Sequence, residues 1–197
     1  GYTPNDIVNT AIFEPMLAGF ADSNASMRED TLKNLVNVVD KLEGKHMHDK
    51  LVRCIVNLQN DSEPSLRTNA TIFLGKIASI LEPSVRTRSV YPSFVRSMRD
   101  PFLHCRLAGL KAITACMNQQ LISASELVDK ILPQVCILLI DPAQPVRELA
   151  MGFMQQSMEA IQENHKILIV AEQKRRAEQE KANQLNQSKS LQMNQSQ

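Results

Sequence analysis

The sequence has 197 residues, 43% hydrophobic and 22% charged, and its 22 lysines and arginines nearly balance 21 acidic residues to leave a net charge of +1. Six glycines and eight aromatic residues, none of them tryptophan, disfavour β-sandwiches, barrels and glycine-rich phosphate loops. The balanced charge removes the general electrostatic case for a nucleic-acid or membrane-surface protein, and no apolar run is long enough to span a membrane. The composition therefore indicates a helical protein.

In chain order we expect four regions. Residues 1–10 are interpreted as a lead-in from a missing upstream region, because the sequence opens without an initiator methionine. Residues 11–165 are predicted to form an array of repeats, and residues 166–183 an extended charged helix. Residues 184–197 are rich in Gln, Asn and Ser, which predicts a disordered tail.

The array is identified by a motif that recurs four times, with an aspartate six residues before an arginine and an apolar residue just before that arginine. Successive aspartates are 39, 39 and 41 residues apart. The four copies are Asp22–Arg28, Asp61–Arg67, Asp100–Arg106 and Asp141–Arg147. Four copies in phase at this spacing are typical of a helical repeat protein.

The residues around the motif keep the same phase. Apolar residues recur five, six and nine positions before each aspartate, and a small and then a large residue occur three and seven positions after each arginine. Each unit is thus two amphipathic helices joined by a turn that carries the aspartate, because such spacings describe one face of a helix. A three-helix armadillo unit lacks a third apolar stripe. The predicted fold is an all-α right-handed solenoid of four HEAT repeats with an extended last helix.

Helix-capping residues and prolines also occur where these units predict helix ends. Ser123 and Glu126 have the spacing of a capping box before the fourth repeat. Pro64 stands where a second helix is expected to begin, a position that tolerates a missing N–H. Three further prolines are predicted to bend or start the first helix of their repeats: Pro15, Pro92 and Pro133.

The repeated arginine needs a physical reason, because a cation in the first turn of a helix opposes the helix dipole. We expect each arginine to bind an aspartate of its own or a neighbouring repeat, so that the eight motif residues form a ladder along the turns. The alternative is four unrelated, solvated charges.

Several strings also resemble a known family. Leu-Gly-Lys-Ile at 74–77 and Arg-Asp-Pro-Phe at 99–102, with the segments 27–33 and 130–136, are similar to the HEAT domain of the Scy-like, or N-terminal-kinase-like, pseudokinases. Among these the chain most resembles the type tied to Golgi-to-ER traffic. The resemblance implies a larger protein with a pseudokinase domain upstream.

What the resemblance implies is a non-catalytic scaffold or adaptor in COPI-linked vesicle trafficking. Its partners would be coat or trafficking proteins, and its location cytoplasmic, with peripheral association with Golgi or ER. Two alternatives stay open: a binding module linked to tRNA export, which the family also implies, and a HEAT scaffold subunit of an unrelated complex.

No catalytic, cofactor-binding or metal site is expected. The sequence has no Walker, dinucleotide-binding or zincin motif, so we predict no enzyme activity. His46 and His48 form the one tight histidine cluster, but residues two apart on a helix point in different directions and cannot chelate a metal together. The four cysteines stand singly, as expected of reduced thiols.

Two surfaces are candidate binding sites. Arg86, Arg88, Arg96 and Arg99 form an arginine-rich stretch suited to an acidic peptide, a phospholipid headgroup or the RNA backbone of tRNA, and the alternative is an ordinary solvated helix face. The apolar run 167–170 is expected to cap the open end of the solenoid or to join another chain in self-association.

Overall fold

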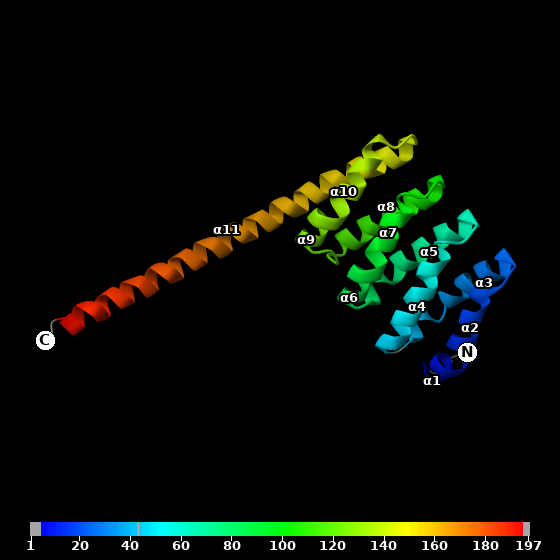
Figure 1. Cartoon of the computed structure of the whole chain (residues 1–197), viewed down its shortest axis with the longest axis horizontal. Coiled ribbons are helices and arrows are strands. Elements are labelled where there is room, and N and C mark those ends of the chain that lie inside the picture. The colour runs from blue at the N-terminus through cyan, green and yellow to red at the C-terminus, as the bar shows by residue number, and fades with distance from the viewer. Residues whose placement is uncertain (1–4, 43, 195–197) are drawn as a thin grey trace. The chain divides into compact units, whose positions relative to one another are not determined.

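A computed structural model describes residues 5–42 and 44–194 of the chain. Within these ranges every regular element is a helix, which confirms the predicted all-α class (Figure 1). The chain divides after Met154 into two units, a repeat array and a C-terminal helical segment. The repeats predicted from the aspartate–arginine motif correspond to successive helical hairpins in the first unit.

Each repeat consists of a first helix, the aspartate turn and a second helix. The first helix of repeat one comprises α1 (Asn5–Ile7), η1 (Val8–Ile12), α2 (Phe13–Ala18) and η2 (Gly19–Ala21), and that of repeat two is α4 (Lys45–Leu58). In repeat three it comprises α6 (Pro83–Val85), η5 (Arg86–Val90) and α7 (Tyr91–Ser97). In repeat four it comprises α9 (Ala124–Glu126), η6 (Leu127–Ile131), α10 (Leu132–Cys136) and η7 (Ile137–Ile140). The second helices are α3 (Ala25–Leu35) with η3 (Val39–Lys41), α5 (Pro64–Ile77) with η4 (Ala78–Ile80), α8 (Leu103–Asn118) and the start of α11 (Gln144–Asn194).

The prolines explain why some first helices are interrupted. A proline inside a helix lacks the N–H that would bond the carbonyl four residues earlier. In repeats one, three and four a π-helical turn (η1, η5 and η6) precedes Pro15, Pro92 and Pro133 respectively, and the wider turn accommodates the missing bond. In repeat two, α4 contains no proline and is uninterrupted.

The helix starts follow the predicted caps. Ser123 and Glu126 form the complete capping box, in which the Ser123 side chain accepts from the Glu126 N–H and the Glu126 side chain accepts from the Ser123 N–H. The helix α5 begins at Pro64. These local signals confirm that the ends of these elements are encoded in a few residues on either side.

The core of the array lies between the two helix rows. The second helix of repeat three, α8, packs against both α5 and α7. Gly109 permits the α7 contact, because a Cβ there would lie 2.8 Å from the carbonyl oxygen of Phe94. The buried side chains include the predicted stripe residues Phe13, Tyr91 and Phe94.

The observed boundaries differ from the predicted ones at both ends. Residues 5–10 are not a lead-in, because they belong to the first helix of repeat one and Val8 is buried in its core. The array, expected to reach residue 165, belongs to a unit that ends at Met154. Residues 184–194 continue α11 instead of being disordered, and their glutamine, leucine, methionine and lysine residues have favourable helix propensity. Residues 1–4 and 195–197 lie outside the described residues.

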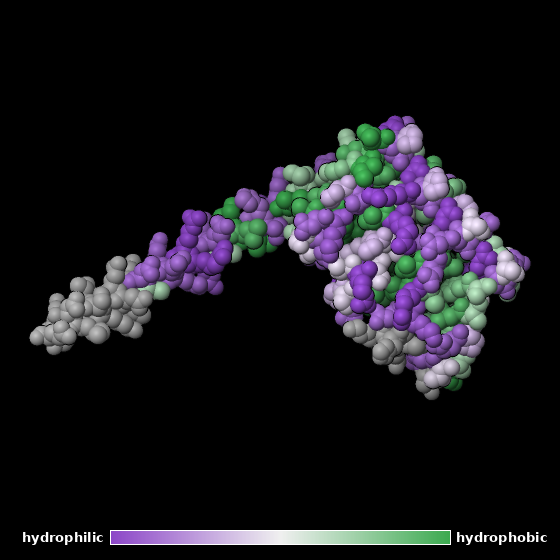
Figure 2. All heavy atoms as spheres, in the orientation of Figure 1, coloured by the Kyte–Doolittle hydropathy of each residue, from purple (hydrophilic) through white to green (hydrophobic). Residues whose placement is uncertain are grey.

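The second unit is a single helical segment from Gln155 onward. Its apolar run from Ile167 to Val170 is exposed, and strongly hydrophilic residues follow it along the helix (Figure 2). Four consecutive apolar residues surround a helix instead of forming one stripe. Capping and self-association by this run stay predictions.

Candidate functional site

Successive repeats are joined by ion pairs between the motif residues. The arginine of each repeat binds the aspartate of the next one in three pairs: Arg28–Asp61, Arg67–Asp100 and Arg106–Asp141. In the central pair, Arg67 Nε lies 2.7 Å from Asp100 Oδ2 and Arg67 Nη2 lies 3.0 Å from Asp100 Oδ1. Such two-pronged pairing is the strongest geometry available to an arginine and a carboxylate.

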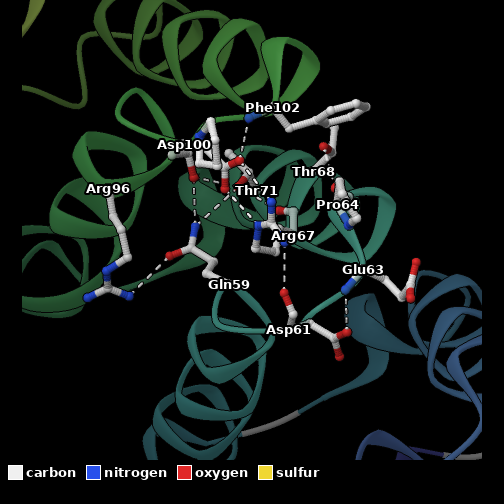
Figure 3. Close-up of polar contacts among 12 residues, drawn as sticks. Gln59, Asp61, Glu63, Pro64, Arg67, Thr68, Thr71, Arg96, Asp100 and Phe102 are labelled. Carbon is white, nitrogen blue, oxygen red and sulfur yellow. Dashed lines mark hydrogen bonds and ion pairs between the residues drawn. The ribbon is translucent and has the colours of Figure 1, made fainter.

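Each of these arginines also binds the turn of its own repeat, as Figure 3 shows for Arg67. Arg67 Nη1 donates to the backbone oxygens of Asp61 at 2.9 Å and Ser62 at 3.1 Å. Asp100 in turn accepts the N–H of Phe102 at 2.8 Å and so closes the turn that precedes α8. One guanidinium therefore holds its own turn and the neighbouring turn together, which offsets the unfavourable position of a cation at a helix start.

The electrostatics of the ladder follow from this geometry. The hydrogen bond from Arg28 lowers the pKa of Asp61, and the nearby Glu63 N–H acts in the same direction. Burial by itself raises the pKa of Asp100, but the hydrogen bonds from Arg67 and the Phe102 N–H, together with the positive charge of Arg67, outweigh it, so that pKa is also lowered. Both aspartates are thus held in their charged form.

The two ends of the ladder differ from its centre. Asp22 accepts the Asn24 N–H at 2.7 Å, yet in the described part of the chain no arginine pairs with its carboxylate. Arg147 Nη1 donates to the backbone oxygen of Asp141 at 2.7 Å, but no carboxylate in the described ranges pairs with it. Among the described residues, the aspartates and arginines of the motif therefore form ion pairs only where one repeat contacts the next.

A buried polar cluster lies beside the central ion pair and was not predicted. Gln59 Nε2 donates to Thr71 Oγ1 at 3.2 Å and to Ser97 Oγ at 3.0 Å, and the two hydroxyls lie 2.7 Å apart. Gln59 also donates to the Ser93 carbonyl at 3.2 Å. The available signal was polar residues at positions that are apolar in the other repeats. The cluster ties repeats two and three together, because buried polar groups that bond one another resist separation.

The four arginines predicted as a binding surface do not lie in one environment. Arg86 is turned into the fold, where its guanidinium donates to the Leu81 carbonyl and its Nε is buried. Arg88 is exposed and lies 3.5 Å from Asp49. Arg96 and Arg99 are exposed and donate to Gln59 and Gln134 respectively. The candidate surface therefore reduces to three arginines, because the Arg86 guanidinium binds carbonyls at the end of the preceding repeat.

The groups that could support chemistry are separated. Within the described residues no group of three or more His, Cys, Asp and Glu side chains could hold a metal ion. The side chain of His46 lies outside what the structure describes, so the expectation for the His46–His48 pair stays a prediction. None of the four cysteines forms a disulfide, and burial raises the pKa of Cys116 to about 11.

The second helices α3, α5 and α8 present two adjoining hollows. The larger, of about 600 Å³, lies between α5 and α8. The smaller, of about 170 Å³, lies between α3 and α5, and the two share Ile72 and Lys76. These second helices lie side by side, as Figure 1 shows. No helix among the described residues has the length and apolar character needed to cross a membrane.

Comparison with known proteins identifies the relatives of this repeat array. No family model matches the chain. It is 33% identical over 159 residues to the protein kinase domain-containing protein ppk3 of Schizosaccharomyces pombe, and 29% identical over 157 residues to the probable inactive serine/threonine-protein kinase scy1 of Dictyostelium discoideum. The chain is a helical-repeat segment of the Scy-like family. The match covers 80% of it in both cases, but only 24% and 19% of these relatives.

A solved structure supports the same assignment for this Scy-like segment. The crystal structure of Cex1p matches 82% of the chain with a TM-score of 0.75 and 26% sequence identity, and the match covers 30% of that chain. Cytoplasmic export protein 1 of Saccharomyces cerevisiae is 27% identical over 163 residues. The predicted family and the helical-repeat fold are therefore confirmed.

Proposed function

We propose that this Scy-like segment is a non-catalytic scaffold within a larger pseudokinase protein, and that it serves as an adaptor in COPI-linked Golgi-to-ER vesicle trafficking. One observation carries the proposal: the region similar to the Scy-like relatives is a helical repeat array, and one relative is named a probable inactive kinase. Repeat arrays work by presenting long surfaces to other proteins. The trafficking setting is supported by the resemblance of strings such as 74–77 and 99–102.

The ladder supports a scaffolding role for physical reasons. An array of repeats has contacts only between neighbours, so its shape depends on each interface. Here each interface between successive repeats contains an ion pair whose charges are largely shielded from water. Two hydrogen bonds join the pair in Arg28–Asp61 and Arg67–Asp100, and one, from Nη2, joins it in Arg106–Asp141. Such pairs fix the register of one repeat on the next, and a fixed register keeps the positions of surface side chains constant for a partner.

The test is direct binding of purified coatomer to the immobilised protein after ribonuclease treatment. We expect coatomer to be retained, and retained equally by an Arg88→Glu/Arg96→Glu/Arg99→Glu variant, because an adaptor of this kind does not depend on phosphate contacts. The absence of coatomer retention by the full chain would overturn the trafficking proposal.

A second candidate is a binding module linked to tRNA export. Its support is the similarity to Cytoplasmic export protein 1 together with the exposed Arg88, Arg96 and Arg99. Arginine can bind phosphate through two parallel hydrogen bonds. Of the three, only Arg88 pairs with a carboxylate in the described chain, so Arg96 and Arg99 have no competing carboxylate there.

This candidate is tested by the binding of labelled tRNA at several salt concentrations. Phosphate contacts predict affinity that falls steeply with salt and a slope that becomes shallower in the triple charge-reversal variant. Equal affinity of the variant and the unmodified protein at every salt concentration would dismiss the arginine surface.

A further inference from the structure

The larger hollow on the second helices has a floor of small residues. It is lined by one face of α5 and one face of α8, and Ala108 and Ala112 form much of the floor. A Cβ added at Gly75 would lie 3.1 Å from the Cβ of Ala112, so the glycine allows the two helices to approach closely. Small side chains on both helices leave room above them for the large side chains of a ligand.

An apolar wall stands beside this floor. Ile72 keeps 43% of its surface exposed although it lies in the middle of α5. It also lines the smaller hollow, where Val36 is exposed to a similar extent. The two hollows therefore form one apolar track across the second helices of repeats one to three, here called the second-helix groove. Leu107 continues its lining on α8.

The rim of the second-helix groove is basic. Lys76 and Lys111 border the larger hollow, and no carboxylate of the described chain pairs with either. Lys33 borders the smaller hollow and pairs with Glu29 at 3.1 Å. Glu29 is the one acidic residue among the side chains that line the two hollows. The groove thus combines an apolar floor with positive charge on its edges.

The dimensions of the groove fit a helix. The lining of the larger hollow runs from His104, near the start of α8, to Gln119, the residue after its end, and fifteen residues of α-helix span roughly 22 Å. The larger hollow, about 600 Å³, is of the size that accepts several large side chains. A ligand helix of about four turns would cover this length, with apolar residues three and four apart pointing toward the floor.

We propose that the second-helix groove binds an acidic amphipathic helix of a partner protein, with leucine-like side chains over Ile72 and the alanine floor and carboxylates on Lys76 and Lys111. RNA fits less well, because the lining of the larger hollow includes no Phe, Tyr or Trp for base stacking, with His104 the one ring among its residues, and the alanine floor offers no side-chain donors to phosphate. The inference rests on the proposed scaffold function for its biological setting and names the chemistry of the partner.

The probe is a fluorescent peptide of about 15 residues with leucines on one helical face and glutamates on its flanks. Its counterpart with every glutamate replaced by lysine is the matched control. We expect the acidic peptide to bind at least ten-fold more tightly, as measured by fluorescence anisotropy. Methyl chemical shifts of Ile72, Ala108 and Ala112 should move on binding.

Variants locate the site. Lys76→Glu/Lys111→Glu should weaken the acidic peptide about ten-fold or more, and Ile72→Ser about five-fold, while Lys130→Glu on the first helix of repeat four leaves affinity unchanged. All four substituted residues are exposed, and circular dichroism checks that each variant keeps its helices.

Any one of three results would overturn the inference. The two peptides could bind with equal affinity, the chemical shifts could change only at other methyl groups, or the groove variants could bind the acidic peptide as tightly as the unmodified protein does. Binding of tRNA, lost in the lysine variant while no peptide binds, would assign the groove to RNA. If the protein retains coatomer but does not bind the acidic peptide, the adaptor proposal stands and the second-helix groove is not its binding site.

Discussion

The first repeat and the inner repeats carry the same motif in different environments. The residue before the motif arginine is Met27 in repeat one, where half of its surface is exposed, whereas the equivalent Leu66 in repeat two is fully buried. Likewise Asp22 is exposed, and Asp100 has only 10% of its side chain exposed beneath Arg67. The difference shows that the neighbouring repeat, and not the motif itself, decides whether these positions support stability.

The largest effect that tests this comparison is loss of an inner core residue. Leu66→Ala is expected to lower the free energy of unfolding by about 3 kcal/mol, because it leaves a cavity between packed repeats. Met27→Ala, its equivalent in repeat one, should cost less than about 1 kcal/mol. Urea denaturation followed by circular dichroism measures both, and equal losses would contradict the comparison.

The ladder gives the next effect. Asp100→Ala leaves the Arg67 guanidinium largely shielded from water without its carboxylate partner, and we expect a loss of about 3 kcal/mol, at the lower end for a broken buried ion pair. Asp22→Ala removes only an exposed turn contact and should cost about 0.5 to 1 kcal/mol. Thermal unfolding of the two variants under identical conditions measures both losses. Equal unfolding midpoints would show that the paired and the unpaired aspartate contribute equally to stability, contrary to the prediction.

Two glycines sharpen the contrast between packed and open positions. Gly109→Ala should destabilise by about 1 to 3 kcal/mol, because the new methyl group meets the backbone of α7. Gly152→Ala should stabilise by up to about 1 kcal/mol, since a Cβ there meets nothing within 4 Å and alanine favours the helix. Opposite signs in urea denaturation are the expected result, and a gain at both sites would argue against close packing at Gly109.

The smallest effect is the pH dependence. The folded-state pKa values of Asp61 and Asp100 lie below those of the unfolded chain, so the stability they contribute is complete above the unfolded value of about 4. It is lost as the pH falls through the folded pKa, because the carboxylates must then be protonated. Asp100→Asn should flatten this acid dependence measured by thermal unfolding. An unchanged profile would show that the central pair does not control it.

Much of the fold could be predicted because repetition supplies four independent samples of one pattern. Phase agreement on both sides of Asp61 and Asp100 identified two helices and a turn without any spatial information. The caps at Ser123 and Pro64 depend on residues within one turn of the helix, so local sequence was sufficient there. The break before Pro92 was expected, but its form as a π-helical turn was not.

The site was harder to predict. Four arginines close in sequence suggested one surface, yet Arg86 turns inward to the carbonyls of Ala78 and Leu81 at the end of the preceding repeat, because the last carbonyls of a helix can still accept hydrogen bonds. The Gln59 cluster was missed because its members come from three helices. The second-helix groove was missed for the same reason, as no segment of sequence contains both of its walls.

By itself the sequence determined the helical hairpin, its period and the family, because these depend on the spacing of residues along one chain. Only the tertiary structure decided that Arg67 reaches forward to Asp100 instead of binding within its own motif, and that Ile72 and Lys76 stand across an apolar floor from Lys111. The physical reason is that each contact joins residues about one repeat apart, so its existence depends on how the repeats stack.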